Sequence, residues 1–414
     1  MTNTKHFSSQ TLLEWVHDAR AKTFKLVEDL TDEQMMGPKL ETVNPLLWEI
    51  GHAAYFQELW VLRRNGEKSL ISSADKIYDS IHIPHEDRWG LPLVPRNEIY
   101  QYLRDIRDKV LDLLESDRYT DEDVYHILYS IFHEDMHTEA FTYTRQTLGL
   151  SNTFKKNTPD NFQELPKSVQ KDIQFRSRNF MLGGSKNDPF VFDNEKWEHS
   201  VHLDAFAMGQ TPVTQGEYLK FVQESGYERQ KLWEKDGWNW VNREHIPGPV
   251  YWENNENGNW NWRVFNKRIP LALDHPVIHV NWYEADAYCR WAGRRLPAEA
   301  EWECASQGAD KNKSNLDWRN PNTVSVNAYP ESESTSGCLH MLGNVWEWTK
   351  TTFNPFPGFT PDSYKEYSQP LFSQTKILKG GCWATRSRLI RNSYRNYYTP
   401  DRRDVFAGFR TCAL

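Results

Sequence analysis

The first 150 residues follow the repeat of an amphipathic α-helix. Apolar residues recur at intervals of three and four in four separate stretches, the spacing that places them on one helix face. The stretches cover residues 12–30, 46–59, 100–114 and 124–136, and the last is expected to start after a cap at Thr120 or Asp121. Four helices of this length, with one long connection over roughly 66–95, predict a four-helix bundle.

The pattern changes twice after this region. Residues 151–178 are polar, weakly periodic and contain two prolines, which is typical of a linker. From residue 179 onward Gly, Asn, Pro and Trp are frequent and apolar runs are short. Helices are predicted there over 282–291 and 298–305, and the remainder is expected to form loops and short strands. The predicted organisation is a helical domain (1–150), a linker (151–178) and a second domain (179–414).

Composition and charge exclude several classes of protein. The 414 residues include 49 Lys and Arg against 57 Asp and Glu, without a long block of one sign, which argues against a nucleic-acid-binding protein. No apolar run approaches the ~20 residues of a membrane helix, and the N-terminus lacks the pattern of a signal peptide. Five cysteines without a C-x-x-C pair argue against disulfides or a thiolate zinc site. We expect a cytoplasmic protein without nucleic-acid or membrane partners.

Histidines of the predicted bundle form a candidate metal site. His133 and His137 are four residues apart, so their side chains share one helix face. His52, in the second predicted helix, is the third candidate, and the adjacent Gly51 would let another helix approach closely. Three neutral imidazoles leave coordination positions open for water, O2 or substrate, and imidazole suits both iron and zinc.

The same stretch also matches the H-E-x-x-H pattern of zinc peptidases. In that alternative His133 and His137 bind zinc, and Glu134 acts as general base. Ala140 and Tyr143 stand where the extended form of that motif has Gly and His. A zinc hydrolase therefore stays a minor alternative, together with a lectin-like binding module that holds a structural metal.

The second half of the chain carries motifs of a known fold. They are TPVTQGEYLKFV (211–222), HPVIHVNWYEADAYCRWAGRRLPAEAEWECA (275–305), MLGNVWEWT (341–349), LKGGCW (378–383) and DVFAGFR (404–410). These stretches resemble a formylglycine-generating-enzyme-type domain, which is C-type-lectin-like, and the histidine-bearing bundle resembles a DinB-type metal bundle. The combination is similar to the EgtB-like ergothioneine-type sulfoxide synthases and the SenA-like selenoneine synthases. The implied fold class is α + (α+β), a DinB-like four-helix bundle followed by a C-type-lectin-like domain.

The resemblance implies a nonheme Fe(II) enzyme. It would use O2 as co-substrate to join a chalcogen to the imidazole ring of hercynine, the trimethylated betaine of histidine. One iron would be held by His52, His133 and His137, at an active site between the two domains. The partners implied are small molecules: hercynine and a thiol or selenol donor.

The resemblance also assigns substrate residues. The proton-donating tyrosine of the family falls in a Y-x-x-Y-S-Q-P stretch and corresponds here to Tyr364. The family's R-N-W-D stretch, which binds both substrates, corresponds to Arg395, Asn396, Tyr397 and Tyr398. The expected substrate-binding residues are Arg88, Met136, Tyr367, Asn396, Tyr397 and Tyr398.

Departures from the best-known members of the family concern the chalcogen donor. Those members use a glutamine where this chain has Met136, and two arginines plus an aspartate for γ-glutamylcysteine. Here Arg88 matches the first arginine, while Leu91 and Tyr398 replace the other two. Loss of one cation and one anion removes partners that a charged dipeptide needs. We therefore expect cysteine to be favoured over γ-glutamylcysteine, with selenoneine synthesis from a selenosugar as the alternative. Formylglycine generation is not expected, because Cys382 lacks a nearby second cysteine.

Overall fold

The computed structural model describes all residues except 1–6, 117, 155–170 and 255–258. Its internal contacts divide the chain into two units, which are described separately. Unit 1 consists of Met1–Leu148 and Lys186–Val191, and unit 2 of Gly149–Ser185 and Phe192–Leu414. Most of the expected linker lies outside the described residues. Its last part differs from expectation, because Asp172–Phe175 forms strand β1 and Arg178 begins strand β2.

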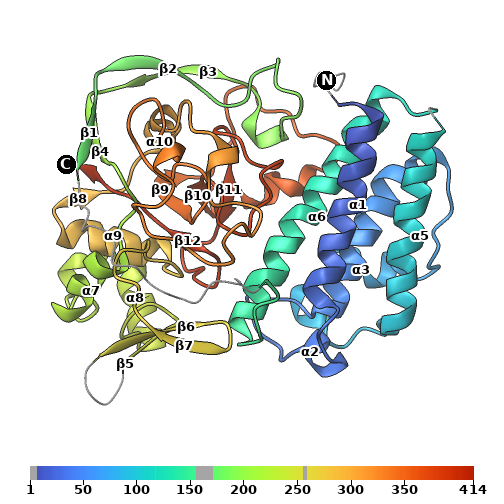
Figure 1. Ribbon diagram of the computed structural model, residues 1–414, viewed down its shortest axis with the longest axis horizontal. Coiled ribbons are helices and arrows are strands. Elements are labelled where there is room, and N and C mark those ends of the chain that lie inside the picture. Colours follow the sequence, from blue (N-terminus) through green and yellow to red (C-terminus); the bar gives the residue numbers. More distant parts are fainter. Residues whose placement is uncertain (1–6, 117, 155–170, 255–258) are drawn as a thin grey trace. The chain divides into compact units, whose positions relative to one another are not determined.

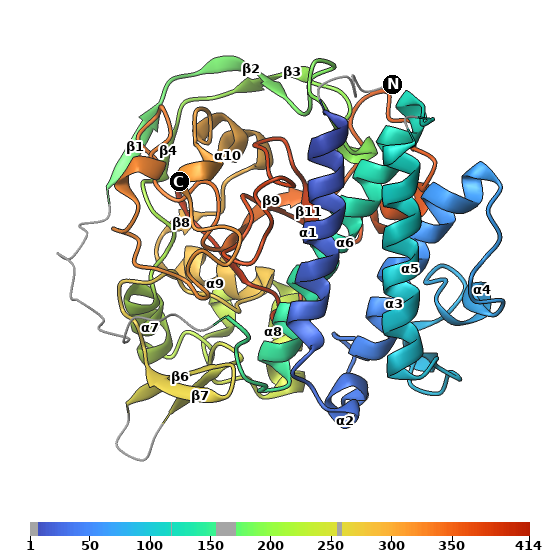
Figure 2. The same ribbon diagram turned by 45° about the vertical axis from the view of Figure 1, so that its right-hand side comes forward.

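Unit 1 is built on four long helices, as the apolar repeat predicts. Helix α1 packs against α5 and α6, and α3 packs against the same two helices, so the four surround one core (Figures 1 and 2). A five-residue π-helix continues α3, and two short helices complete the unit. The bounds are α1 Ser9–Val27, α2 Asp32–Met36, α3 Leu46–Gln57, the π-helix Glu58–Leu62, α4 Ala74–Ile77, α5 Arg96–Glu115 and α6 Asp121–Thr147.

Helix α6 begins where the sequence predicts. The Thr120 side chain accepts a hydrogen bond from the Asp123 backbone N–H, and the Asp123 carboxylate accepts one from Thr120 N–H in return. This reciprocal cap satisfies two backbone donors that a helix start otherwise leaves unpaired. The 27-residue helix is buried on most of its faces, so polar residues such as Glu134 must find partners inside the unit.

A short segment from beyond the expected domain boundary completes the core of unit 1. Phe190 is 3% exposed, and its ring lies 5.2, 6.0 and 4.9 Å from the rings of Tyr125, Tyr129 and Phe132 on α6. Val191 beside it is fully buried. Residues 186–191 therefore belong to the bundle by contact, although they follow the first strands of unit 2.

Unit 2 consists of small sheets and short helices connected by long loops. Its sheets have the strand orders β1-β4-β13-β8, β11-β10-β9-β12, β2-β3 and β5-β6-β7. The described strands are β1 Asp172–Phe175, β2 Arg178–Leu182, β3 His199–Leu203, β4 Phe206–Gly209, β5 Trp252–Asn254, β6 Trp260–Val264, β7 Lys267–Pro270, β8 Arg294–Arg295, β9 Trp346–Thr352, β10 Lys376–Lys379, β11 Asn396–Tyr398, β12 Ala407–Gly408 and β13 Cys412–Ala413.

The helices of unit 2 include both predicted ones. Residues 282–291 form α9, and the predicted helix over 298–305 is α10; α7 and α8 were not predicted by the apolar repeat. The bounds are α7 Gln215–Gln223, α8 Lys235–Glu244, α9 Trp282–Trp291 and α10 Glu299–Ala305.

Tryptophans form much of the core of unit 2. Trp302 donates its indole N–H to Glu347 at 2.8 Å, and Trp348 donates to the Val280 carbonyl at 2.9 Å. Both side chains are fully buried, so large rings fill the core while their polar atoms stay paired. Gly343, in the MLGNVWEWT stretch, has φ +75°, and a Cβ there would lie 2.4 Å from the Asn315 carbonyl oxygen. The glycine of this motif is thus required by the backbone conformation and by close packing against Asn315.

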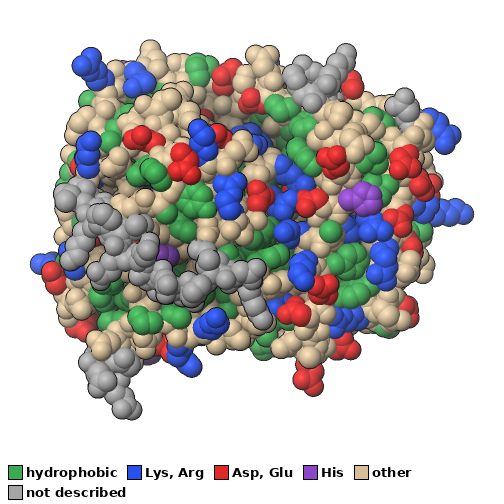
Figure 3. Space-filling model, in the orientation of Figure 1, with side chains coloured by type: hydrophobic (Ala, Val, Ile, Leu, Met, Phe, Trp, Pro, Cys, Tyr) green, Lys and Arg blue, Asp and Glu red, His purple; other side chains and the backbone are tan. Residues whose placement is uncertain are grey.

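The structure also describes the cysteines, the polarity of the helices and the charges on one face of the surface. All five cysteines are buried and free of disulfides. Within the described residues, every helix is too short or too polar to cross a bilayer. On the face drawn in Figure 3, basic and acidic side chains are interspersed.

Candidate metal centre and substrate-binding residues

Helices α3 and α6 bring three histidines of unit 1 together. One ring nitrogen from each of His52, His133 and His137 lies within 4.8 Å of the others. The ring centroids are 4.5–5.1 Å apart, and His52 and His133 are buried. The predicted convergence of the three imidazoles is confirmed.

Two of the three rings are oriented by oxygen acceptors. Nδ1 of His52 lies 2.8 Å from the Tyr78 carbonyl oxygen, and Nδ1 of His137 lies 2.7 Å from Oε1 of Glu49. Because those oxygens accept, each Nδ1 carries a hydrogen, which leaves Nε2 as the ring nitrogen available to a metal. The His133 ring stacks on Phe56 at 3.7 Å, and its Nδ1 is buried without a hydrogen-bond partner among the described residues.

Burial favours the neutral form of His52 and His133, which is the form of imidazole that binds a metal. Burial, with smaller contributions from the charges of His137 and Arg88, lowers the pKa of His52 to about 3. Burial likewise holds the pKa of His133 well below its usual value. The donor set therefore fits a divalent cation such as Fe(II) or Zn(II).

Gly51 permits a close approach, but by a different neighbour from the one expected. A Cβ on this residue would lie 2.3 Å from the Tyr78 ring, so the glycine admits Tyr78 rather than another helix. Tyr78 is fully buried and belongs to the long connection between α3 and α5. Its close approach places the carbonyl that orients His52.

Glu134, the candidate base of the H-E-x-x-H alternative, is engaged elsewhere. Its carboxylate forms a 3.0 Å ion pair with Arg20 and accepts a 2.7 Å hydrogen bond from the Thr23 hydroxyl, both on α1. The side chain is 2% exposed. These contacts explain Glu134 as a buried packing residue between α1 and α6.

Arg88 and Met136 both lie in unit 1 near the histidines. The Arg88 guanidinium lies 3.9 Å from the Trp48 ring centre, and Trp48 stacks parallel on His52 at 5.0 Å. Arg88 also donates to Asn44 Oδ1 at 2.6 Å. Met136 is half-buried on α6, directly before His137. Arg88 is thus held within electrostatic range of the candidate metal centre.

The tyrosines expected to bind substrate lie in unit 2. Tyr364 precedes a 3-10 turn that ends at Tyr367, and Tyr397 donates its hydroxyl to the Tyr367 carbonyl. The Tyr397 ring stacks on Phe353 at 4.0 Å. Burial raises the pKa of Tyr397 well above its usual value, and the nearby Tyr364 adds to this shift. The structure therefore groups Tyr364, Tyr367 and Tyr397.

The tyrosine loop, residues 361–370, is bonded to residues 193–196, which lie just after the point where the chain re-enters unit 2 at Phe192. Ser368 donates to Asp193 at 2.5 Å and accepts from Asn194 at 3.1 Å. Lys196 forms a 2.6 Å ion pair with Asp362 at the other end of the loop. Burial raises the pKa of Asp193 to about 6. These contacts fix both sides of Tyr364.

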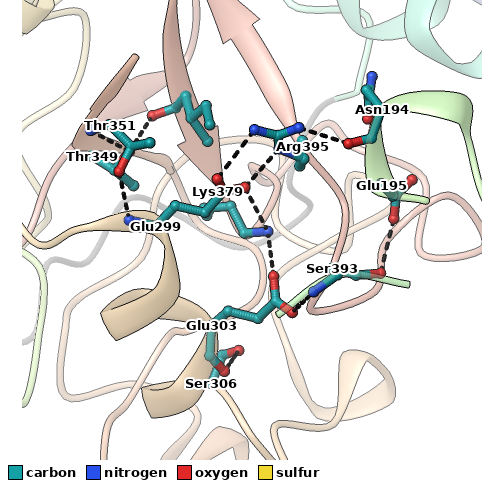
Figure 4. A network of polar contacts seen from close by, with 12 residues as sticks. Asn194, Glu195, Glu299, Glu303, Ser306, Thr349, Thr351, Lys379, Ser393 and Arg395 are labelled. Carbon is teal, nitrogen blue, oxygen red and sulfur yellow. Dashed lines mark hydrogen bonds and ion pairs between the residues drawn. The ribbon is translucent and has the colours of Figure 1, made fainter. Parts of the chain in front are cut away.

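Arg395 is committed to a buried network, shown in Figure 4. It pairs with Glu299 at 2.8 Å and donates to the Asn194 carbonyl at 2.6 Å. Lys379 lies 3.8 Å from Glu299 and 3.0 Å from Glu303 in the same network. Arg395 is 2% exposed. Its buried contacts therefore anchor the residue directly before strand β11.

Asn396 and Tyr398 are half-buried on strand β11. The Asn396 side-chain oxygen accepts a 2.9 Å hydrogen bond from the Tyr397 backbone N–H. The guanidinium of Arg402 lies 5.0 Å from the Tyr398 ring centre.

Sequence reasoning did not identify Glu49 or Asp193. Glu49 precedes His52 by three residues on a predicted helix, so its placement on the same face was available from spacing. Asp193 carries no such signal, because its partner Ser368 is 175 residues away in the chain.

Comparisons with known proteins match both units. The Sulfatase-modifying factor enzyme 1-like domain matches residues 159–413, and the DinB superfamily matches residues 16–140. The hercynine oxygenase of Mycobacterium tuberculosis is 33% identical, and the match covers 95% of this chain and 96% of that protein. The hercynine oxygenase of Mycolicibacterium thermoresistibile is 32% identical over 95% and 92%. The formylglycine-generating enzyme of Streptomyces coelicolor is 28% identical over 60% of this chain and 90% of that protein.

Proposed function

The chain belongs to the hercynine oxygenase family, and from this premise we propose that it forms a carbon–sulfur bond between hercynine and a thiol, with O2 as co-substrate. The imidazole loses one C–H and the thiol its S–H. A C–S bond forms, and O2 supplies one oxygen atom to the sulfoxide and one to water. The observation that carries the proposal is the group of three imidazoles on α3 and α6.

We assign Fe(II) as the metal and His52, His133 and His137 as its ligands. Bound Fe(II) supplies the redox chemistry that activates O2. The protein's part is to direct three imidazoles to one point, to which the acceptors Tyr78 and Glu49 contribute, and to keep His52 and His133 neutral through burial.

Tyr364 is the proposed proton donor. A phenol within hydrogen-bond reach of the reacting imidazole can manage its proton. The ties of Ser368 to Asp193 and of Asp362 to Lys196 support this role, since they hold the loop on both sides of Tyr364. The quaternary ammonium of hercynine cannot accept a hydrogen bond, so aromatic faces must hold it.

Cysteine is the proposed donor, and Arg88 the residue that binds its carboxylate. The guanidinium is held by Asn44 and Trp48 beside His52, and a fixed guanidinium pairs bidentately with a carboxylate. γ-Glutamylcysteine carries two further charges remote from its sulfur, and an unpaired buried charge costs several kcal/mol. Leu91 and Tyr398 offer no counter-charge to them.

A selenosugar is the alternative donor. Stacking on Tyr397 would carry that alternative, but Phe353 already covers a face of this ring at 4.0 Å and its hydroxyl is bonded to Tyr367. The described contacts of Tyr397 therefore support packing more than sugar binding.

The decisive experiment loads the protein with Fe(II) under anaerobic conditions, adds hercynine, and then admits O2 with cysteine, γ-glutamylcysteine or a selenosugar in parallel. We expect O2 consumption and a cysteinyl sulfoxide by mass spectrometry. Selenoneine as the sole product would establish the alternative donor, and no O2 uptake with any donor would refute the function.

Histidine variants test the metal assignment in the same assay. His133→Ala and His137→Ala should lose both iron and turnover, because two remaining imidazoles rarely hold Fe(II) against water. His82→Ala is the matched control, since this histidine is exposed and pairs only with Asp79 among the described residues. Full iron occupancy in His133→Ala would refute the ligand assignment.

A further inference from the structure

The contact between Glu49 and His137 has a consequence for metal binding. We propose that Glu49 is a positioning residue of the metal site: its carboxylate holds His137 in the tautomer that directs Nε2 to the metal, and its charge strengthens that ligand. The inference rests on the proposed function for the presence of the metal. Its basis is the 2.7 Å distance between Glu49 Oε1 and His137 Nδ1.

The environment of Glu49 offers its carboxylate one side-chain partner among the described residues. The residue is 2% exposed, and among the described residues His137 is the sole hydrogen-bond or ion-pair partner of its side chain. A buried carboxylate without a compensating cation costs several kcal/mol. Two other buried glutamates of unit 1 have different partners: Glu134 pairs with Arg20, and Glu58 accepts hydrogen bonds from Tyr102 and the Leu70 backbone. For Glu49 the partner is the ring of His137, so the carboxylate acts on whatever Nε2 of that ring binds.

The three ligands differ in what orients them. His52 donates to a neutral carbonyl, and the buried Nδ1 of His133 has no hydrogen-bond partner among the described residues. His137 alone of the three has an anionic partner. A carboxylate on the outer nitrogen raises the basicity of a ligating imidazole and fixes its orientation, and loss of such partners weakens metal binding or activity about 10–100-fold. Glu49 therefore makes the imidazole of His137 the most basic of the three metal ligands.

The local fold explains how Glu49 reaches this position. Glu49 and His52 are three residues apart on α3, so both side chains project from the same face toward α6. One residue of α3 thus supplies a ligand and another supports the ligand of the facing helix. Glutamate has the length to reach Nδ1, whereas an alanine here would leave that nitrogen without an acceptor.

Two substitutions separate hydrogen bonding from charge. Glu49→Gln keeps an acceptor oxygen for Nδ1 but removes the charge, and Glu49→Ala removes both. We expect divalent-metal affinity to fall in the order wild type, Glu49→Gln, Glu49→Ala, with a loss of about 10–100-fold for the alanine variant. The matched control is Glu58→Gln, which removes the charge of an equally buried glutamate that contacts none of the histidines in the described contacts.

Affinity is measured under anaerobic conditions by titration with Fe(II) and, as a redox-stable probe, Mn(II). The tautomer is measured separately on the metal-free protein, by 15N chemical shifts of the histidine rings. Wild type should show hydrogen on Nδ1 of His137, and Glu49→Ala should lose that preference. Circular dichroism checks that each variant is folded. If Glu49→Ala does not fold, Glu49→Gln alone is used to test the effect on metal affinity.

Each outcome decides a different point. Unchanged metal affinity in both Glu49 variants would overturn the proposal, and so would an equal loss in Glu58→Gln, which would indicate general destabilisation. A wild-type protein that binds neither metal would refute the metal centre of the proposed function, while the 15N shifts would still report whether Glu49 orients His137.

Discussion

Glu134→Gln provides the sharpest test of how this chain uses its H-E-x-x-H sequence. The substitution keeps the shape of the side chain and removes its charge. Arg20, 1% exposed, then loses its ion-pair partner inside the bundle. Breaking a buried pair by neutralising one partner costs about 3–5 kcal/mol, because the other charge stays buried without compensation.

The expected result is a less stable bundle with an intact metal site. For a unit of about 150 residues, 1 kcal/mol corresponds to roughly 2–4 °C in Tm, so thermal unfolding followed by circular dichroism at 222 nm should shift downward by roughly 6–20 °C. Fe(II) affinity below the transition should equal that of wild type, because the described contacts of Glu134 are to Arg20 and Thr23 on α1. Turnover per bound iron should also be retained.

Two controls identify the origin of the shift. Arg20→Met combined with Glu134→Met removes both charges, and such apolar replacement of a buried pair is often neutral or stabilising; the double variant should therefore recover most of the lost Tm. Glu28→Gln removes the charge from the exposed pair with Lys25 and should barely change Tm. An unchanged Tm in Glu134→Gln, together with lost activity at full iron occupancy, would refute the packing role and favour a base.

Three further predictions follow from other contacts. Phe190→Ala should destabilise the bundle by about 3–5 kcal/mol, as for other buried phenylalanines. The Tm of the helical signal in circular dichroism should fall; an unchanged Tm would show that the Phe190 side chain does not stabilise the bundle. Gly51→Ala should displace Tyr78 and weaken metal binding while the fold measured by circular dichroism persists; wild-type affinity would contradict the role of the Tyr78 carbonyl. Arg88→Leu should raise KM for cysteine at least ten-fold, about 1.4 kcal/mol, with iron content unchanged; an unchanged KM would remove Arg88 as the carboxylate site.

The sequence predicted those features of the fold that depend on neighbours in the chain. The predicted limits of α9 agree with the structure, and the cap of α6 is Thr120, one of the two predicted positions. The convergence of the histidines followed from helical spacing plus the expectation of one bundle. Phe190 could not be placed in the bundle, because its contacts with α6 join residues about 60 positions apart and it lies in the connection between strands β2 and β3, which belong to unit 2.

The role of Glu134 shows why a short motif does not determine chemistry. In a helix, consecutive residues differ in direction by about 100°, so a glutamate directly after a ligating histidine leaves the metal-facing side. In this chain that direction leads to Arg20 and Thr23 on α1, which complete its hydrogen bonding. Among the described contacts, the acidic residue bonded to one of the proposed metal ligands is Glu49, which pairs with His137, comes from the facing helix and lies outside the motif. In the proposed metal site, the same four-residue spacing of histidines is combined with a carboxylate that orients a ligand, and the position of that carboxylate distinguishes the proposal from a hydrolytic site, in which the glutamate of the motif acts as base.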